Sequence, residues 1–88
     1  MKFEWDENKS RSNEDKHGIN FMFATKLWND VDRIEIRTSF PDEMRHILIG
    51  KINSKVWVAV YTIRNEAIRI ISVRRARKKE QNLYEQKK

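Results

Sequence analysis

Apolar and polar positions change their spacing several times along the chain, and each spacing predicts a different element. Phe3 and Trp5 alternate with polar residues, which predicts a short strand over residues 2–5. The stretch 7–17 contains no apolar side chain. Even so, Asp6 suits the N-cap position of a helix, and Gly18 suits the left-handed residue that follows a helix. We therefore predict a helix over 7–17 that lacks an apolar stripe.

The next segment supplies the apolar surface that this helix lacks. Phe21, Ala24, Leu27 and Trp28 recur at helical spacing after Asn20, a good N-cap, and predict a second helix. Alternating or continuous apolar runs then predict strands, separated by short turns, over 32–39, 45–52, 56–63 and 67–73.

From Arg75 onward the pattern becomes helical again, with Ala76, Leu83 and Tyr84 on one face. The predicted order is β-α-α-β-β-β-β-α. Such grouping of helices and strands is typical of an α+β fold, here a single domain over residues 1–88 with an antiparallel meander packed by helices.

The amino-acid composition excludes some classes of protein and of metal site. The 88 residues contain no cysteine and two histidines, which excludes a disulfide framework or thiolate metal site and argues against a histidine-rich metal centre. We expect no cofactor. No segment has the apolar length needed to cross a bilayer, and the first residues lack the apolar core of a signal peptide. We therefore expect a cytoplasmic protein without a membrane partner.

The net charge of +6 is concentrated in one segment. Residues 64–79 hold seven Lys or Arg side chains and one acid, Glu66, while the remainder of the chain is neutral. A localised cationic surface favours a polyanion or an acidic partner. The alternative is that these side chains form an ordinary solvated helix face.

The predicted first helix gathers polar groups on one face. Lys9, Asn13, Lys16 and His17 are spaced so that they share that face. Such a face suits RNA phosphates or an acidic partner. His17 is a candidate for proton transfer near neutral pH, but it could equally cap the C-terminal end of the helix, with Asn13 bonding to backbone.

Arginines at strand positions are candidates for phosphate binding. Arg64 lies where the central strand meets its turn, and its alternative is an ion pair with Glu66. Arg69 alternates with apolar residues, so it requires an acidic partner or lines a groove, and Arg45 follows the same reasoning on another strand.

Residues 74–79 carry the highest density of positive charge in the chain. We expect salt-sensitive attraction to phosphates here, although the lysines could simply favour solubility. Glu80 and Tyr84 lie one helical turn apart and are candidates for proton transfer; the alternative is that Tyr84 packs and Glu80 pairs with a lysine. The basic side chains of this segment are Arg74, Arg75, Arg77, Lys78 and Lys79.

Two sets of fixed polar positions carry a family resemblance that extends over nearly the whole chain. The stretch "FEWDENKSRSNEDKHGINF" is similar to the N-terminal signature of the BrnT family, and "RIISVRRARKKEQNLYE" is similar to its C-terminal pattern. The first set comprises Phe3, Trp5, Asp6, Lys9, Asn13, Lys16, His17, Gly18, Ile19 and Phe21. The second comprises Arg69, Ile70, Ile71, Ser72, Arg74, Ala76, Glu80 and Tyr84.

The resemblance implies a RelE-like fold and a toxin of a type II toxin–antitoxin system that cleaves RNA and arrests growth by blocking translation. It also implies a BrnA-like antitoxin with a ribbon-helix-helix part, in a 2:2 complex that binds operator DNA. Metal-independent RNA cleavage needs a base, an acid and cations that stabilise the phosphorane. On this reading the catalytic candidates are His17, Arg64, Lys9, Lys16, Arg74, Glu80 and Tyr84. The RNA-binding candidates are Arg45, Arg69, Arg75, Arg77, Lys78 and Lys79.

Two other functions fit the residues. A non-catalytic RNA- or DNA-binding regulator would also need a basic groove, so composition alone does not separate it from a ribonuclease; without the family resemblance the regulator ranks first. A protein–protein adaptor with an acidic partner is the third possibility. The ribonuclease interpretation requires the cations of 64–79 to meet the Lys and His side chains of the first helix at one concave surface.

Overall fold

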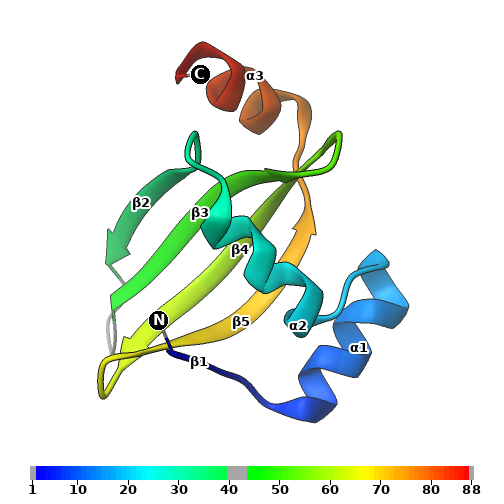
Figure 1. The fold of residues 1–88 in the computed structure, drawn as a ribbon, viewed down its shortest axis with the longest axis vertical. Helices are drawn as coiled ribbons and strands as arrows, with labels where there is room; N and C mark the ends of the chain where they lie inside the picture. The colour runs from blue at the N-terminus through cyan, green and yellow to red at the C-terminus, as the bar shows by residue number, and fades with distance from the viewer. Residues whose placement is uncertain (1, 40–43, 88) are drawn as a thin grey trace.

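The computed structural model of the chain describes residues 2–39 and 44–87, and within them five strands form one sheet (Figure 1). The strands lie in the order β1-β5-β4-β3-β2. Their bounds are β1 Lys2–Glu4, β2 Ile34–Ser39, β3 Met44–Ile52, β4 Lys55–Arg64 and β5 Ala67–Arg75. The predicted turn over residues 40–43 lies outside the described residues.

The sheet is mixed, which corrects one part of the sequence-based prediction. Strands β2 to β5 form the expected antiparallel meander, whereas β1 pairs parallel with β5. A parallel neighbour requires a long connection, and the two helical segments between β1 and β2 begin that connection. The α+β class is confirmed, but a purely antiparallel sheet is wrong.

The first helix, α1 (Glu7–His17), forms as its cap residues predict. The Asp6 carboxylate accepts hydrogen bonds from the backbone N–H groups of Asn8 and Lys9, and Gly18 ends the helix with a φ of 79°. A positive φ strains residues that carry a Cβ, so glycine fits this position.

The predicted second helix is divided into two short pieces. An α-helix, α2 (Phe21–Ala24), starts after the Asn20 cap and continues directly as a 3-10 helix, η1 (Thr25–Asn29). The tighter 3-10 turn changes the angular spacing of side chains, and it accompanies the complete burial of Leu27 and the near-complete burial of Trp28. The last helix, α3 (Lys78–Lys87), follows β5.

Each face of the sheet has its own apolar cluster. On one face, α2 and η1 lie across the sheet and pack Phe21, Leu27 and Trp28 against alternate residues of the central strands (Figure 1). On the other face, Tyr84 of α3 packs with Val56 and Val58 near the start of β4. Therefore α3 covers only one end of the second face, and the end of β4 on that face lies away from it.

The helices of the described residues are all too short to cross a bilayer, and none carries the run of apolar side chains that this would need.

Candidate functional site: a basic cavity on the sheet

A row of polar side chains crosses the second face of the sheet. Thr62 of β4 pairs directly with Arg69 of β5, and Arg45 of β3 and Thr62 each lie one residue beyond His46–Tyr61, the last pair of the β3–β4 ladder. Side chains directly opposite one another project to the same face. Arg45, Thr62 and Arg69 thus form one transverse row, which we call the arginine row. Arg64, two residues after Thr62, projects to the same face.

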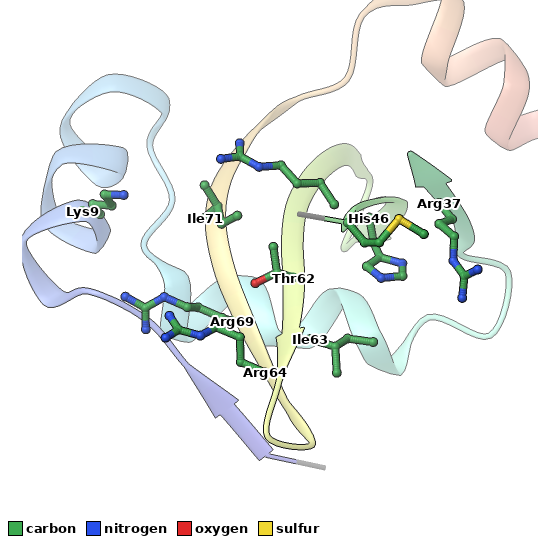
Figure 2. Close-up of a pocket in the computed structure, with 10 residues that line it drawn as sticks. Lys9, Arg37, His46, Thr62, Ile63, Arg64, Arg69 and Ile71 are labelled. Atoms are coloured by element: carbon green, nitrogen blue, oxygen red, sulfur yellow. The ribbon is translucent and has the colours of Figure 1, made fainter. Parts of the chain in front are cut away.

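A cavity of about 600 Å³ lies over this row (Figure 2). We call it the basic cavity, because five Lys or Arg side chains and one His line it and its described lining contains no acidic residue. In Figure 2, Thr62, Arg64 and Arg69 project to the same side of β4 as Lys9 of α1, whereas Ile63 and His46 project to the other side. The lining residues are Lys9, Arg37, Met44, Arg45, His46, Thr62, Ile63, Arg64, Arg69 and Ile71.

An irregularity in β5 shapes this end of the sheet. Val60 pairs with Ser72 while Tyr61 pairs with Ile70, so Ile71 is an extra residue on β5. Such bulges bend a strand and redirect its side chains, and they are frequent beside functional sites. Because of the bulge, Arg69 lies on the same face as Arg74 although the two residues are five positions apart in the sequence. Simple alternation along the sequence predicts opposite faces.

Arg69 is held at the cavity by one carboxylate. Its Nη1 donates to Oε2 of Glu4 at 3.3 Å, across the parallel pairing of β1 with β5. Among the described residues this is the only hydrogen bond of the Arg69 side chain. A guanidinium carries five N–H donors, so Arg69 retains donors for an anion.

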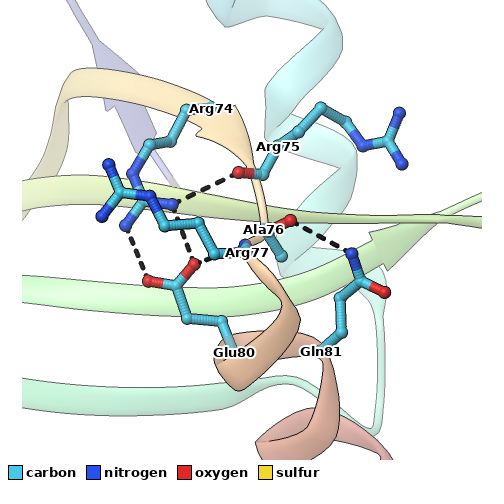
Figure 3. Close-up of polar contacts among 6 residues, drawn as sticks. All are labelled: Arg74, Arg75, Ala76, Arg77, Glu80 and Gln81. Atoms are coloured by element: carbon cyan, nitrogen blue, oxygen red, sulfur yellow. Dashed lines mark hydrogen bonds and ion pairs between the residues drawn. The ribbon is translucent and has the colours of Figure 1, made fainter.

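Arg74 is engaged more fully, by Glu80 at the start of α3 (Figure 3). Its Nη1 and Nη2 donate to the two carboxylate oxygens of Glu80 at 2.8 and 2.7 Å, and Nη1 also donates to the Arg75 carbonyl. The Arg77 N–H donates to the same carboxylate at 2.7 Å. These interactions, with the hydrogen bond from Arg74 foremost, lower the pKa of Glu80 to about 2.

These contacts tie Glu80 and Arg74 to the fold. A carboxyl group with such a low pKa is ionised at neutral pH, so it has no proton to donate. The carboxylate instead accepts from the backbone at the start of α3, as an acid in a capping box does. The predicted catalytic roles of Glu80 and Arg74 find no support in this geometry.

Tyr84 also has a structural partner. Its side chain is 2% exposed, and its hydroxyl donates to Oδ2 of Asp30 at 2.6 Å. The same Asp30 oxygen accepts from the Lys51 backbone N–H at 2.8 Å. Burial, reinforced by the bond to Asp30, raises the pKa of Tyr84 well above its ordinary value. Tyr84 therefore keeps its proton, links α3 to β3 and the end of η1, and is not among the residues that line the basic cavity.

The remaining predicted site residues lie elsewhere on the surface. Lys16 and His17 are exposed in the last turn of α1, and neither lines the basic cavity. The Arg75 guanidinium lies 5.4 Å from the centre of the Trp57 ring, on the opposite face of the sheet from the arginine row. Arg77, Lys78 and Lys79 are exposed where α3 begins.

The fold therefore brings together only some of the candidate residues that the sequence predicted to meet at one surface. The fold brings together Lys9, Arg45, Arg64 and Arg69, and it leaves outside the cavity Lys16, His17, Arg74, Arg75, Arg77, Lys78, Lys79, Glu80 and Tyr84. The physical reason is that alternation along the strands, the bulge and the rotation of α1 direct neighbouring cations to different surfaces.

Three polar lining residues, Arg37, His46 and Thr62, were missed by reasoning from the sequence. Thr62 carried a usable signal, because it is a hydroxyl in an otherwise apolar strand, two residues before Arg64. Arg37 and His46 carried none, since their positions depend on the pairing of β2 with β3. The His46 ring stacks on Tyr61, with centroids 5.0 Å apart.

In the described part of the chain, no group of three or more His, Cys, Asp or Glu side chains could hold a metal ion. The cavity contributes mainly N–H donors, which bind anions.

Comparison with protein families identifies one match. Residues 5–80 match the family model described as "Ribonuclease toxin, BrnT, of type II toxin-antitoxin system". A comparison with curated proteins finds no match. The family match spans most of the chain, including α1, the meander and the start of α3. The chain therefore belongs to the BrnT family of ribonuclease toxins of type II toxin–antitoxin systems.

Proposed function

We propose that this BrnT-family toxin is a RelE-like endoribonuclease that cleaves RNA at the basic cavity without a metal ion. The observation that carries the proposal is the convergence of Lys9, Arg64 and the arginine row from three strands and a helix, with no acid in the described lining. Convergent cations bind a phosphate and stabilise the added charge of a phosphorane. Cleavage of the toxin's RNA targets would block translation.

The cavity groups divide into two roles. Arg64 and Arg69 face the same side and hold the scissile phosphate through paired N–H donors. Lys9, presented by α1, supplies a titratable group for proton transfer to the leaving oxygen. The fixed sheet scaffold keeps the arginines in position, which favours an in-line arrangement of the attacking 2′-oxygen.

A cleavage assay with purified protein tests this proposal. RNA is incubated with the wild-type protein, with R64A and R69A, and with R75A as a control for loss of charge outside the cavity, each with and without EDTA. We expect cleavage that persists in EDTA, falls about 100-fold or more in R64A and R69A, and is retained in R75A. Loss of cleavage on chelation would overturn the metal-independent mechanism.

A non-catalytic RNA- or DNA-binding regulator is the second candidate. It is favoured by the structural engagement of Glu80 and Tyr84, which leaves few groups for acid–base chemistry near the cavity. Intact RNA in the same assay, combined with salt-sensitive binding to the wild-type protein and weaker binding to R69A, would favour this function.

The antitoxin is the expected protein partner. Membership of a type II family implies one, and we propose a BrnA-like protein with a ribbon-helix-helix part, in a 2:2 complex that binds operator DNA. The basic cavity suits an acidic segment of such a partner. Expression of this chain alone should arrest growth and stop amino-acid incorporation, and coexpression of a small open reading frame adjacent to its gene should restore both. Light scattering of the purified complex tests the 2:2 stoichiometry.

A further inference from the structure

The hydroxyl of Thr62 belongs to a nearly buried residue that lines the basic cavity, and it has no hydrogen-bond partner among the described residues. The residue is 5% exposed. Figure 2 shows its oxygen directed to the side of β4 on which Lys9 and Arg69 lie. A hydroxyl that has no protein partner and opens onto a cavity keeps its donor and its acceptor for a bound group.

The neighbours of Thr62 indicate which group this is. Thr62 occupies the middle of the arginine row, with Arg45 on one adjacent strand and Arg69 on the other. Both arginines line the same cavity as Thr62, one from each neighbouring strand. Guanidinium groups on both sides suit two phosphates. In a nucleic-acid strand, the group between two successive phosphates is a sugar.

We propose that the Thr62 hydroxyl binds the 2′-hydroxyl of the ribose between two phosphates and so gives the basic cavity its preference for RNA over DNA. This inference rests on the proposed function, because it takes RNA as the ligand of that cavity. A threonine hydroxyl and a ribose 2′-hydroxyl each donate and accept, so they form a hydrogen bond in either direction. The 2′-hydroxyl is also the group by which proteins distinguish RNA from DNA.

The preference for RNA would arise because the cavity binds deoxyribose less well than ribose. With deoxyribose in the cavity, the bound sugar covers the Thr62 hydroxyl and leaves it unpaired. A site with a polar group that must be paired discriminates against an analogue that cannot pair it. Phosphate contacts of Arg45 and Arg69 are the same for both sugars, so they contribute affinity without contributing this preference.

Binding of a small ligand that cannot be cleaved tests the inference. The probes are adenosine 3′,5′-bisphosphate and its 2′-deoxy analogue, each of which places one sugar between two phosphates. Calorimetric titration of the wild-type protein should give a Kd about tenfold lower for the ribose probe. In T62V, which replaces the hydroxyl by a methyl group of similar size, the two probes should bind equally, with the deoxy Kd unchanged. T62S, which retains a hydroxyl, should retain the preference.

The control is T25V, which makes the same substitution in η1, outside the cavity lining. It should keep the wild-type preference. Equal weakening of both probes by T62V would show that the hydroxyl contacts phosphate, and failure of both probes to bind the wild-type protein would show that the cavity is not a nucleotide site; each result overturns the inference. Because the probes contain no bond to cleave, an absence of cleavage activity leaves this test intact.

Discussion

The side-chain amide of Asn13 takes the place of a neighbouring strand beside Val73. Its Nδ2 donates to the Val73 carbonyl at 2.9 Å, and its Oδ1 accepts from the Val73 N–H at 3.1 Å. Nδ2 also donates to the Ile19 carbonyl at 2.8 Å. Strand β1 pairs with β5 only as far as Arg69, so Asn13 completes the pairing further along that edge. A helix without apolar side chains is thus docked by buried hydrogen bonds.

Replacement of Asn13 tests the importance of this docking. N13A leaves three buried backbone hydrogen-bonding groups without their partner, and it should lower the free energy of unfolding by about 2–4 kcal/mol. Urea denaturation followed by circular dichroism measures the change. N8A, an exposed substitution on the same helix, is the control and should change stability by about 0.5 kcal/mol or less. Equal effects of the two substitutions would contradict the assigned role of Asn13.

The Arg74–Glu80 pair predicts a specific dependence of stability on pH. The folded pKa of Glu80, about 2, lies below the ordinary value of 4.5, so the folded state binds this proton less readily than the unfolded state does. The pair therefore contributes its full stabilisation above about pH 4.5 and loses it as the pH falls towards 2. We expect E80Q to be less stable by up to about 3 kcal/mol at pH 7, and the difference should narrow below pH 4. A difference that is constant with pH would contradict this.

Removal of the Tyr84 hydroxyl tests whether this group stabilises the fold or takes part in catalysis. Y84F loses the hydrogen bond to Asp30 and should destabilise the fold by about 1–2 kcal/mol. Because Tyr84 does not line the basic cavity, kcat per folded molecule should be unchanged. The measurement is RNA cleavage at a temperature where denaturation curves show both proteins fully folded. A large loss of kcat under those conditions would restore Tyr84 as a catalytic residue.

Salt dependence identifies which arginines contact phosphate. If Arg64 binds a phosphate of single-stranded RNA, R64A should reduce the slope of log K against log salt concentration by about 0.7. R75A removes the same charge from the opposite face of the sheet and should leave the slope unchanged. Filter binding or fluorescence anisotropy at several salt concentrations measures both. Identical slopes for the two variants would place the RNA elsewhere.

Replacement of Glu4 should strengthen RNA binding but slow turnover. E4Q removes a negative charge 3.3 Å from Arg69, so RNA should bind more tightly and KM should fall. The same change loosens Arg69, so kcat should fall about tenfold. E66Q, an equal charge change in the turn between β4 and β5, is the matched control. A kcat that is unaffected by E4Q would show that Arg69 needs no positioning.

Local signals in the sequence were sufficient for much of the fold. Asp6, Gly18 and Asn20 predicted the ends of helices because capping depends on side chains within a few residues. The apolar alternation predicted the meander for the same reason. The parallel pairing of β1 with β5 escaped this reasoning, since nothing within a three-residue strand specifies which distant strand it joins.

The sequence by itself determined that this is an α+β protein with a localised excess of positive charge, and its fixed polar positions indicated the family. Only the tertiary structure decided which cationic side chains lie in the same cavity. Lys9, Arg64 and Arg69 share a cavity, while Arg74 and Arg75 turn to other partners. The physical reason is that caps and alternation act over a few residues, whereas a site on a sheet depends on strand register and on a bulge that shifts it.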